Sequence, residues 1–482
     1  MKLDKRIQEI GLYGISAMLR QAVGFLMLPI YTRYLTPQDY GVIGLLSVTV
    51  FFFELLFGAR FANAVFRYYG DEEVDDDESV ISTALISTII LSLVGVLVIG
   101  YGSDYLGELV FRENGYSGYI KVYSIMLIGT GVEYYGLMYL RILNKVSTFF
   151  YISLSKLIIQ VGLNVYLIVF LQLGVMGFIL SSVISTSLYA FGLACYMFKK
   201  CGRSFDQILF KMMFWYSLPL WLAGAVALFN NMSNRYFINI FSGLSDVGLF
   251  ELGYKFSSLI LVLFWSPFNN WWQVERYRIF RTNKFGDNFN NIFYVITVVL
   301  LVFCVGAIYF SWAAITVMAS EDFKGAILGV APLSFAVVAF CLAQFLEFNF
   351  LVTDKTNMLF AYKIATGLFL VLFYFILISQ SGFVGAAISM AITNTVIVVL
   401  MYLHGKTIID LKLKLSPSLV PFLFSLAFTF LWYSVYFYCK DEYWLMFMFD
   451  LIMYCLYLFL MYWHSRKVIL PFAKKLLWST AI

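Results

Sequence analysis

The sequence carries little charge for its length. Only 13% of its 482 residues are Asp, Glu, Lys or Arg, whereas 62% are hydrophobic, and the mean hydropathy is +0.84. Soluble globular domains carry about 25% charged residues. The shortage of charge excludes an ordinary soluble domain and predicts an integral membrane protein, with the lipid bilayer as its surroundings and no nucleic-acid partner.

Histidine and paired cysteine are also scarce. The chain has two His and six Cys residues, and the cysteines form no CxxC pair. This composition supports neither a zinc site nor a redox motif, and it leaves too few ligands for metal-assisted catalysis. We therefore expect no catalytic residue, no bound metal and no cofactor.

Long hydrophobic runs, in contrast, are abundant. A membrane helix needs about 20 mainly apolar residues. Segments of this kind lie at 9–30, 40–66, 80–101, 119–140, 148–171, 174–198, 209–232, 246–271, 290–312, 327–351, 358–379, 382–403, 417–438 and 443–464. The shortest gaps, at 172–173 and 380–381, indicate tight hairpins. The predicted fold class is an all-α polytopic membrane protein with 14 transmembrane helices.

Positive charge is unevenly distributed over the loops. Cytoplasmic loops of membrane proteins carry an excess of Lys and Arg. If the N-terminus is inside, most of the 33 Lys and Arg residues fall on the cytoplasmic side, and few, among them Arg33, Arg235 and Lys324, fall in outer loops. Both termini are therefore predicted to be cytoplasmic.

The chain also repeats itself. Segment 32–47 resembles 234–253, each reading Arg-Tyr and then Asp-x-Gly, and 144–188 resembles 354–396. Matched positions lie 207 to 210 residues apart, as in the pair Asp39 and Asp246. Because six is an even number, both copies of a six-helix repeat begin on the same side of the membrane. This predicts two parallel lobes around a central cavity. The lobes are 1–200 and 201–405, and 406–482 holds helices 13 and 14 with a cytoplasmic tail.

Four cationic side chains stand within these hydrophobic segments: Arg20, Arg60, Lys156 and Lys255. One charge at the centre of a membrane helix costs about 2.5–3.5 kcal/mol on insertion scales. The cost is avoided where the charge faces a wet cavity or a partner. The four residues therefore predict a positively charged chamber that binds an anionic substrate.

Polar neighbours support the two arginines. Gln21 follows Arg20, which lies about 18 Å from the cytoplasmic end of its helix at roughly 1.5 Å per residue. Asn63 shares a helix face with Arg60. The side chain of Arg60 could also extend to the inner interface instead of the chamber.

The two lysines have different surroundings. One helix face carries Ser153, Lys156, Gln160 and Asn164. This spacing places the four side chains on a single face, which must look inward. Glu251 precedes Lys255 by four residues, the favourable order for an intrahelical ion pair, so a purely structural pair is an alternative at that position.

The segment LPIYTRYLTPQDYGVIGLLS (28–47) resembles the N-terminal signature of the Wzx-type polysaccharide and O-antigen flippases. This family belongs to the MOP exporter superfamily, with the lipid II flippase and the MATE multidrug exporters. The resemblance implies a bacterial inner-membrane flippase that moves an undecaprenyl-diphosphate-linked oligosaccharide of O-antigen, capsule or exopolysaccharide to the outer leaflet by alternating access. Polysaccharide polymerase machinery would be a further partner, and coupling to H+, Na+ or the membrane potential is left open.

The resemblance also implies roles for single residues. Cations in helices 1, 2 and 8 of the lipid II flippase line its cavity, and Arg20, Arg60 and Lys255 hold the matching positions. The role of Lys156 is inferred only from the polar face of its own helix and not from the resemblance.

Two other classes of function remain in view. A MATE-like ion-coupled multidrug exporter is the first, although its cavity would be expected to carry mainly carboxylates and its chain twelve helices. A membrane-embedded glycosyltransferase or polymerase is the second, although it needs catalytic carboxylates or a large loop.

The predicted topology can be tested by cysteine-accessibility labelling in intact cells and in inverted vesicles. We expect Lys200→Cys to be labelled from the cytoplasmic side and Lys324→Cys from the outside. Labelling of both from one side would refute the topology.

Overall fold

The computed structural model describes residue 19 and residues 23–58, 61–71, 76–113, 115–281, 285–408, 416–439 and 442–479. All regular elements in these ranges are helices, as the fold class predicted. The chain forms two compact units, Met1–Gly248 and Leu249–Ile482. The lobes predicted at 1–200 and 201–405 follow from the repeat and not from packing, and they stay a prediction.

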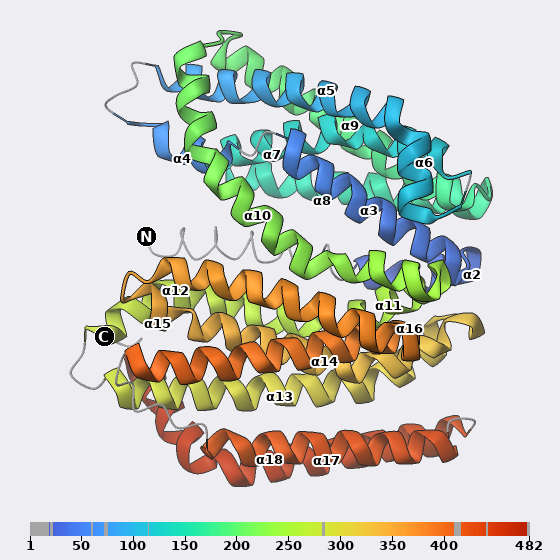
Figure 1. Ribbon diagram of the computed structural model, residues 1–482, viewed down its shortest axis with the longest axis vertical. Coiled ribbons are helices and arrows are strands. Elements are labelled where there is room, and N and C mark those ends of the chain that lie inside the picture. Colours follow the sequence, from blue (N-terminus) through green and yellow to red (C-terminus); the bar gives the residue numbers. More distant parts are fainter. Residues whose placement is uncertain are drawn as a thin grey trace. The chain divides into compact units, whose positions relative to one another are not determined.

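The first unit contains the helices of the N-terminal half (Figure 1). They are α2 (Leu28–Tyr34), α3 (Pro37–Phe57), α4 (Ala62–Tyr68), α5 (Asp77–Phe111), α6 (Ser117–Ser124), α7 (Met126–Ile142), α8 (Val146–Asn164), the π-helix η1 (Val165–Phe170), α9 (Gly174–Cys201) and α10 (Gln207–Ser242). α11 (Leu244–Ser257) begins in this unit and continues into the second.

The second unit contains the remaining elements. They are the π-helix η2 (Leu261–Trp265), α12 (Ser266–Phe280), α13 (Phe285–Met318), the 3-10 helix η3 (Glu321–Ala326), α14 (Ile327–Leu346), α15 (Phe348–Leu351), α16 (Thr356–Ile408), α17 (Ser416–Cys439) and α18 (Tyr443–Ser479).

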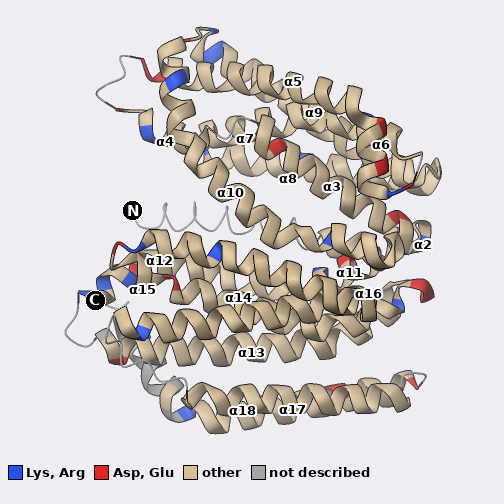
Figure 2. Ribbon diagram, viewed as in Figure 1, with Lys and Arg blue, Asp and Glu red and all other residues tan. Residues whose placement is uncertain are grey.

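Eleven helices in the described part of the chain are long and apolar enough to cross a membrane. α16 contains two of the predicted segments, α6 and α7 are separated at Ile125, and the first predicted segment lies mostly outside the described residues. The count of 14 therefore stays a prediction. Lys, Arg, Asp and Glu stand mainly near helix ends, and the helix interiors are mostly free of them (Figure 2).

Both predicted hairpins are present. Between η1 and α9 the chain turns through Gln172, whose φ is 50°, and Gly174, whose φ is 53°. Within α16 the helix is broken at Ser381 and Gly382. Each gap of two residues is thus a real reversal between helices.

The repeat is visible in the backbone. Gly174 and Gly382, 208 positions apart, have φ values of 53° and 56°. Asn144 and Asp354, 210 positions apart, have φ values of 54° and 57° and precede α8 and α16 by the same distance. Positive φ is uncommon outside glycine, so its recurrence at matched positions supports the duplication.

The Asp-x-Gly motifs begin α3 and α11. Thr36 caps α3, because its hydroxyl accepts a hydrogen bond from the Asp39 N–H at 3.2 Å and its own N–H donates to the Asp39 carboxylate at 3.0 Å. This reciprocal arrangement satisfies amide groups that the helix leaves without partners.

The two motif glycines form a reciprocal contact. A Cβ atom at Gly41 would lie 2.0 Å from the Leu244 carbonyl oxygen, and one at Gly248 would lie 1.9 Å from that of Pro37. Because Leu244 follows Pro37, and Gly248 follows Gly41, by the same 207 positions, the two copies of the motif pack symmetrically. Only glycine allows this approach of two helix backbones.

Proline acts differently in the two matched helices. α10 has Pro219 in its interior and is bent along its length (Figure 1), as expected where a helix loses a backbone hydrogen bond. Pro29 instead stands in the first turn of α2, after an interruption at Met27.

Helices α17 and α18 form an antiparallel pair outside the duplication (Figure 1). The Ser425 and Tyr457 hydroxyls lie 2.8 Å apart, and the Trp432 indole N–H donates to the Asp450 carboxylate at 2.9 Å. The Tyr309 hydroxyl of α13 donates to the Phe428 carbonyl oxygen at 3.0 Å. Two of these buried hydrogen bonds thus join α17 to α18, and the third joins α17 to α13.

Substitution at either motif glycine should destabilise the protein. We expect Gly41→Ala and Gly248→Ala to cost roughly 1–3 kcal/mol, the usual cost of overpacking, and to lower the Tm of the purified protein in detergent. Gly100→Ala is the matched control, because a Cβ at this helical position meets open space; it should raise stability by about 0.5–1 kcal/mol. Equal Tm values for all three variants would contradict the close contact.

Candidate functional site

The predicted site residues differ in how the structure places them. Arg20, Gln21 and Arg60 lie outside the described residues. Asn63 is exposed on α4. The remaining four belong to two helices, α8 and α11, and are described below.

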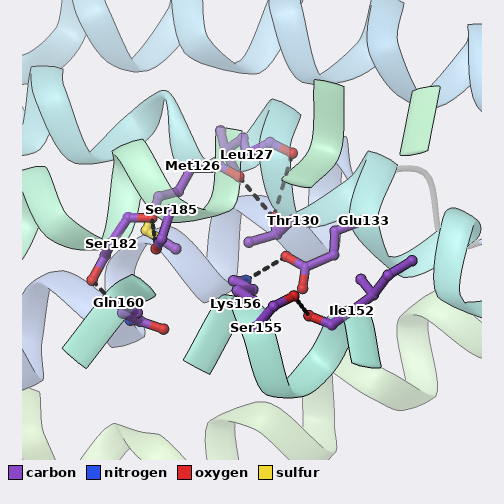
Figure 3. A network of polar contacts seen from close by, with 10 residues as sticks. All are labelled: Met126, Leu127, Thr130, Glu133, Ile152, Ser155, Lys156, Gln160, Ser182 and Ser185. Carbon is purple, nitrogen blue, oxygen red and sulfur yellow. Dashed lines mark hydrogen bonds and ion pairs between the residues drawn. The ribbon is translucent and has the colours of Figure 1, made fainter. Parts of the chain in front are cut away.

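Lys156 on α8 forms an ion pair with Glu133 on α7. The Lys156 Nζ and the Glu133 Oε2 lie 2.5 Å apart, and the two side chains are 19% and 15% exposed. Figure 3 shows the two side chains directed at each other. The positive charge predicted for this helix face is therefore neutralised locally by a partner on the neighbouring helix.

Gln160 extends the same face by one turn. Its amide Nε2 donates to the Ser182 hydroxyl of α9 at 3.5 Å (Figure 3), the far limit of hydrogen bonding. Farther along, Ser181 of α9 donates to the Asn164 side-chain oxygen at 2.5 Å. The predicted polar face of α8 is thus directed at α7 and α9, inside the first unit, as the spacing indicated.

The hydroxyl groups around the ion pair are mostly occupied. Thr130 donates to the Met126 carbonyl oxygen at 2.9 Å, and Ser155 donates to that of Ile152 at 3.1 Å. Ser153, three residues before Lys156, is different, because its Oγ atom is buried and has no hydrogen-bond partner.

Lys255 and Glu251 lie on α11 in the second unit, and both are partly buried. The two charges interact electrostatically. Two residues after Lys255, the buried Ser257 donates to the Val330 carbonyl oxygen at 3.1 Å and accepts from Ser334 at 3.1 Å. α11 therefore carries a pair of opposite charges and is joined to α14 by buried hydrogen bonds.

One cation lies elsewhere than the sequence predicted. Arg235, assigned to an outer loop, is inside α10 and only 5% exposed. It donates to the Asn231 carbonyl oxygen at 3.0 Å and to the Asn234 side-chain oxygen at 2.8 Å. The polar run at 230–235 ended the hydrophobic segment, but these local hydrogen bonds allow the helix to continue to Ser242.

One residue of the site, Glu133, had a weak sequence signal. Glu133 is recognisable as a carboxylate within a hydrophobic segment, but nothing in the sequence pairs it with Lys156.

In the described part of the chain, no three His, Cys, Asp or Glu side chains are grouped to hold a metal ion.

Comparison with solved structures identifies the fold. A structure titled "Lipid II flippase MurJ, inward closed conformation" is similar with a TM-score of 0.69 and 15% identity, covering 95% of this chain and 99% of the other. An inward-facing MATE multidrug resistance transporter gives 0.62 and 16% identity over 83% of this chain and 99% of the other. A MOP superfamily transporter from Pyrococcus furiosus gives 0.52 and 17% identity, over 84% and 96%. The fold is that of the MOP superfamily transporters.

The family follows from the sequence itself. Residues 30–328, more than half of the chain, match the family model described as "Polysaccharide biosynthesis protein", and the chain belongs to this family. Among curated proteins, none matches significantly. The family agrees with the expected one in polysaccharide biosynthesis, and the fold is the one expected for the MOP superfamily.

The ion pair can be tested by a double-mutant cycle in unfolding experiments. Glu133→Ala should cost about 3 kcal/mol, because Lys156 is left with an uncompensated, partly buried charge. Glu133→Gln combined with Lys156→Met should recover most of this loss. If the double variant is as unstable as Glu133→Ala, the charge pair does not explain the cost.

Proposed function

We propose that the protein is a flippase of the bacterial cytoplasmic membrane. It moves an undecaprenyl-diphosphate-linked oligosaccharide repeat unit, destined for O-antigen, capsule or exopolysaccharide, from the cytoplasmic to the outer leaflet by alternating access. The family match to polysaccharide biosynthesis, on a fold shared with a lipid II flippase, is the observation that carries this proposal.

The cations fit the charged part of this cargo. A diphosphate needs charge compensation in a chamber of lowered dielectric. Arg20, Arg60 and Lys255 are proposed to provide it, supported by Gln21, Asn63 and Glu251, while Lys156 and Gln160 are proposed as further contacts to the cargo. Lysine acts toward a phosphate as a point charge, and arginine can hold it bidentately.

A MATE-like multidrug exporter is the alternative, since MATE structures share the fold. The family assignment and the cations in the hydrophobic segments favour the lipid-linked oligosaccharide. Deletion of the gene distinguishes the two: a flippase leaves a lipid-linked oligosaccharide accumulating on the inner leaflet, and an exporter leaves the cells sensitive to drugs. The same proposal places both termini in the cytoplasm and includes contact with polysaccharide polymerase machinery. Coupling of transport to H+, Na+ or the membrane potential is left open.

Two substitutions test the charge requirement. Arg20→Ala and Arg60→Ala should abolish export in a complementation assay at an unchanged level of folded protein, because these cations bind cargo and do not pack. Lys at either position should retain part of the activity if the contact is mainly Coulombic, and little if the guanidinium fork is needed. Lys255→Ala should have a milder effect.

Full export by both alanine variants at normal expression would refute an anionic cargo held by these residues. Protein level in the membrane is measured in parallel, so that loss of folding is distinguished from loss of function.

A further inference from the structure

The ion pair between Lys156 and Glu133 leaves its region of the first unit electrically neutral. A diphosphate approaching Lys156 would meet the Glu133 carboxylate 2.5 Å from the ammonium group. Attraction and repulsion at nearly equal distances largely cancel. The pair is therefore poorly suited to an anion and well suited to a neutral polar group.

The same region offers hydrogen bonds of both kinds. The carboxylate of Glu133 accepts, the ammonium of Lys156 donates, and the amide of Gln160 does both. The hydrogen bond from Gln160 to Ser182 is long, at 3.5 Å, so this amide can turn to another partner at little cost. A sugar hydroxyl is both donor and acceptor and matches such a set.

Ser153 adds a hydroxyl without a partner to the same helix face. Its buried hydroxyl has no hydrogen-bond partner, although hydrocarbon surroundings make an unsatisfied polar group costly. Neighbouring hydroxyls, such as that of Ser155, are satisfied by their own helix. Residues three and four apart share a helix face, which places Ser153 beside Lys156 and Gln160.

The charged pair is partly exposed. The side chains of Lys156 and Glu133 keep 19% and 15% of their surface exposed, whereas the Ser153 hydroxyl beside them is buried. We propose that Ser153, Lys156 and Gln160 of α8, with Glu133 of α7, bind hydroxyl groups of the glycan and not the diphosphate. This assignment rests on the proposed function and divides the cargo between two kinds of site.

The proposal is tested by binding of two lipids to the purified full chain in nanodiscs. One is the lipid-linked oligosaccharide extracted from the source cells after deletion of this gene, and the other is bare undecaprenyl diphosphate. Ser153→Ala should weaken binding of the first about tenfold, the upper range for one hydrogen bond, and leave the second unchanged. Ser155→Ala, with a hydroxyl already bonded within the helix, is the matched control and should change neither.

The charged pair is tested with Glu133→Gln combined with Lys156→Met, which strands no charge. It should weaken binding of the oligosaccharide lipid about a hundredfold, because it removes a charged donor and a charged acceptor for glycan hydroxyls. Bare undecaprenyl diphosphate has no glycan and should bind unchanged. Arg20→Ala should weaken binding of both lipids by the same factor.

The remaining outcomes are decisive. Equal loss of both lipids in the Ser153 and paired variants would assign the group to the diphosphate, and no loss of either would make it structural; both results overturn the proposal. If the unaltered protein binds neither lipid, the proposed function itself fails, and this inference fails with it.

Discussion

Hydrocarbon provides no hydrogen-bond partner, and this constraint organises the molecule. Each polar group in a membrane segment must be satisfied within the protein, which explains why every regular element in the described ranges is a helix. Side chains follow the same rule: the hydroxyls of Thr49, Thr88 and Ser389 each donate to the carbonyl oxygen four residues earlier. Other polar groups are satisfied by a neighbouring helix, as in the contact of Ser425 with Tyr457, and the pair of Glu133 and Lys156 is a charged contact of this kind.

The same constraint affects how helices associate. Apolar side chains gain little by leaving lipid for another helix, so close packing of small residues contributes more. The contact of Gly41 with Leu244 and of Gly248 with Pro37 joins α3 and α11 through backbone atoms. The two Asp-x-Gly motifs are similar in sequence, and each contributes one glycine and one carbonyl oxygen to this contact. Separation of such a surface leaves no charge unpaired.

Much of the fold could be predicted because the signals are local. The hairpins at 172–173 and 380–381 follow from chain length and turn residues, and the repeat follows from motifs such as Asp-x-Gly. Features that depend on side-chain hydrogen bonds and ion pairs were missed. Arg235 ended a predicted helix because hydropathy cannot register hydrogen bonds to Asn231 and Asn234. The polar face of α8 was predicted from its spacing, but its partner Glu133 lies 23 positions away on another helix, and that pairing depends on how α7 and α8 are rotated.

The pair also raises the question of why it is kept. Replacing a buried ion pair by hydrophobic residues of similar volume is often neutral or stabilising, so stability alone does not require Lys156 and Glu133. The unpartnered hydroxyl of Ser153 on the same face costs stability as well. Groups that lower the stability of the empty protein are explained when a ligand completes their hydrogen bonds. The cargo proposed above joins a charged diphosphate to a glycan, and such a molecule needs both kinds of surface. Unlike a cationic surface, a neutral set of donors and acceptors can distinguish one glycan from another.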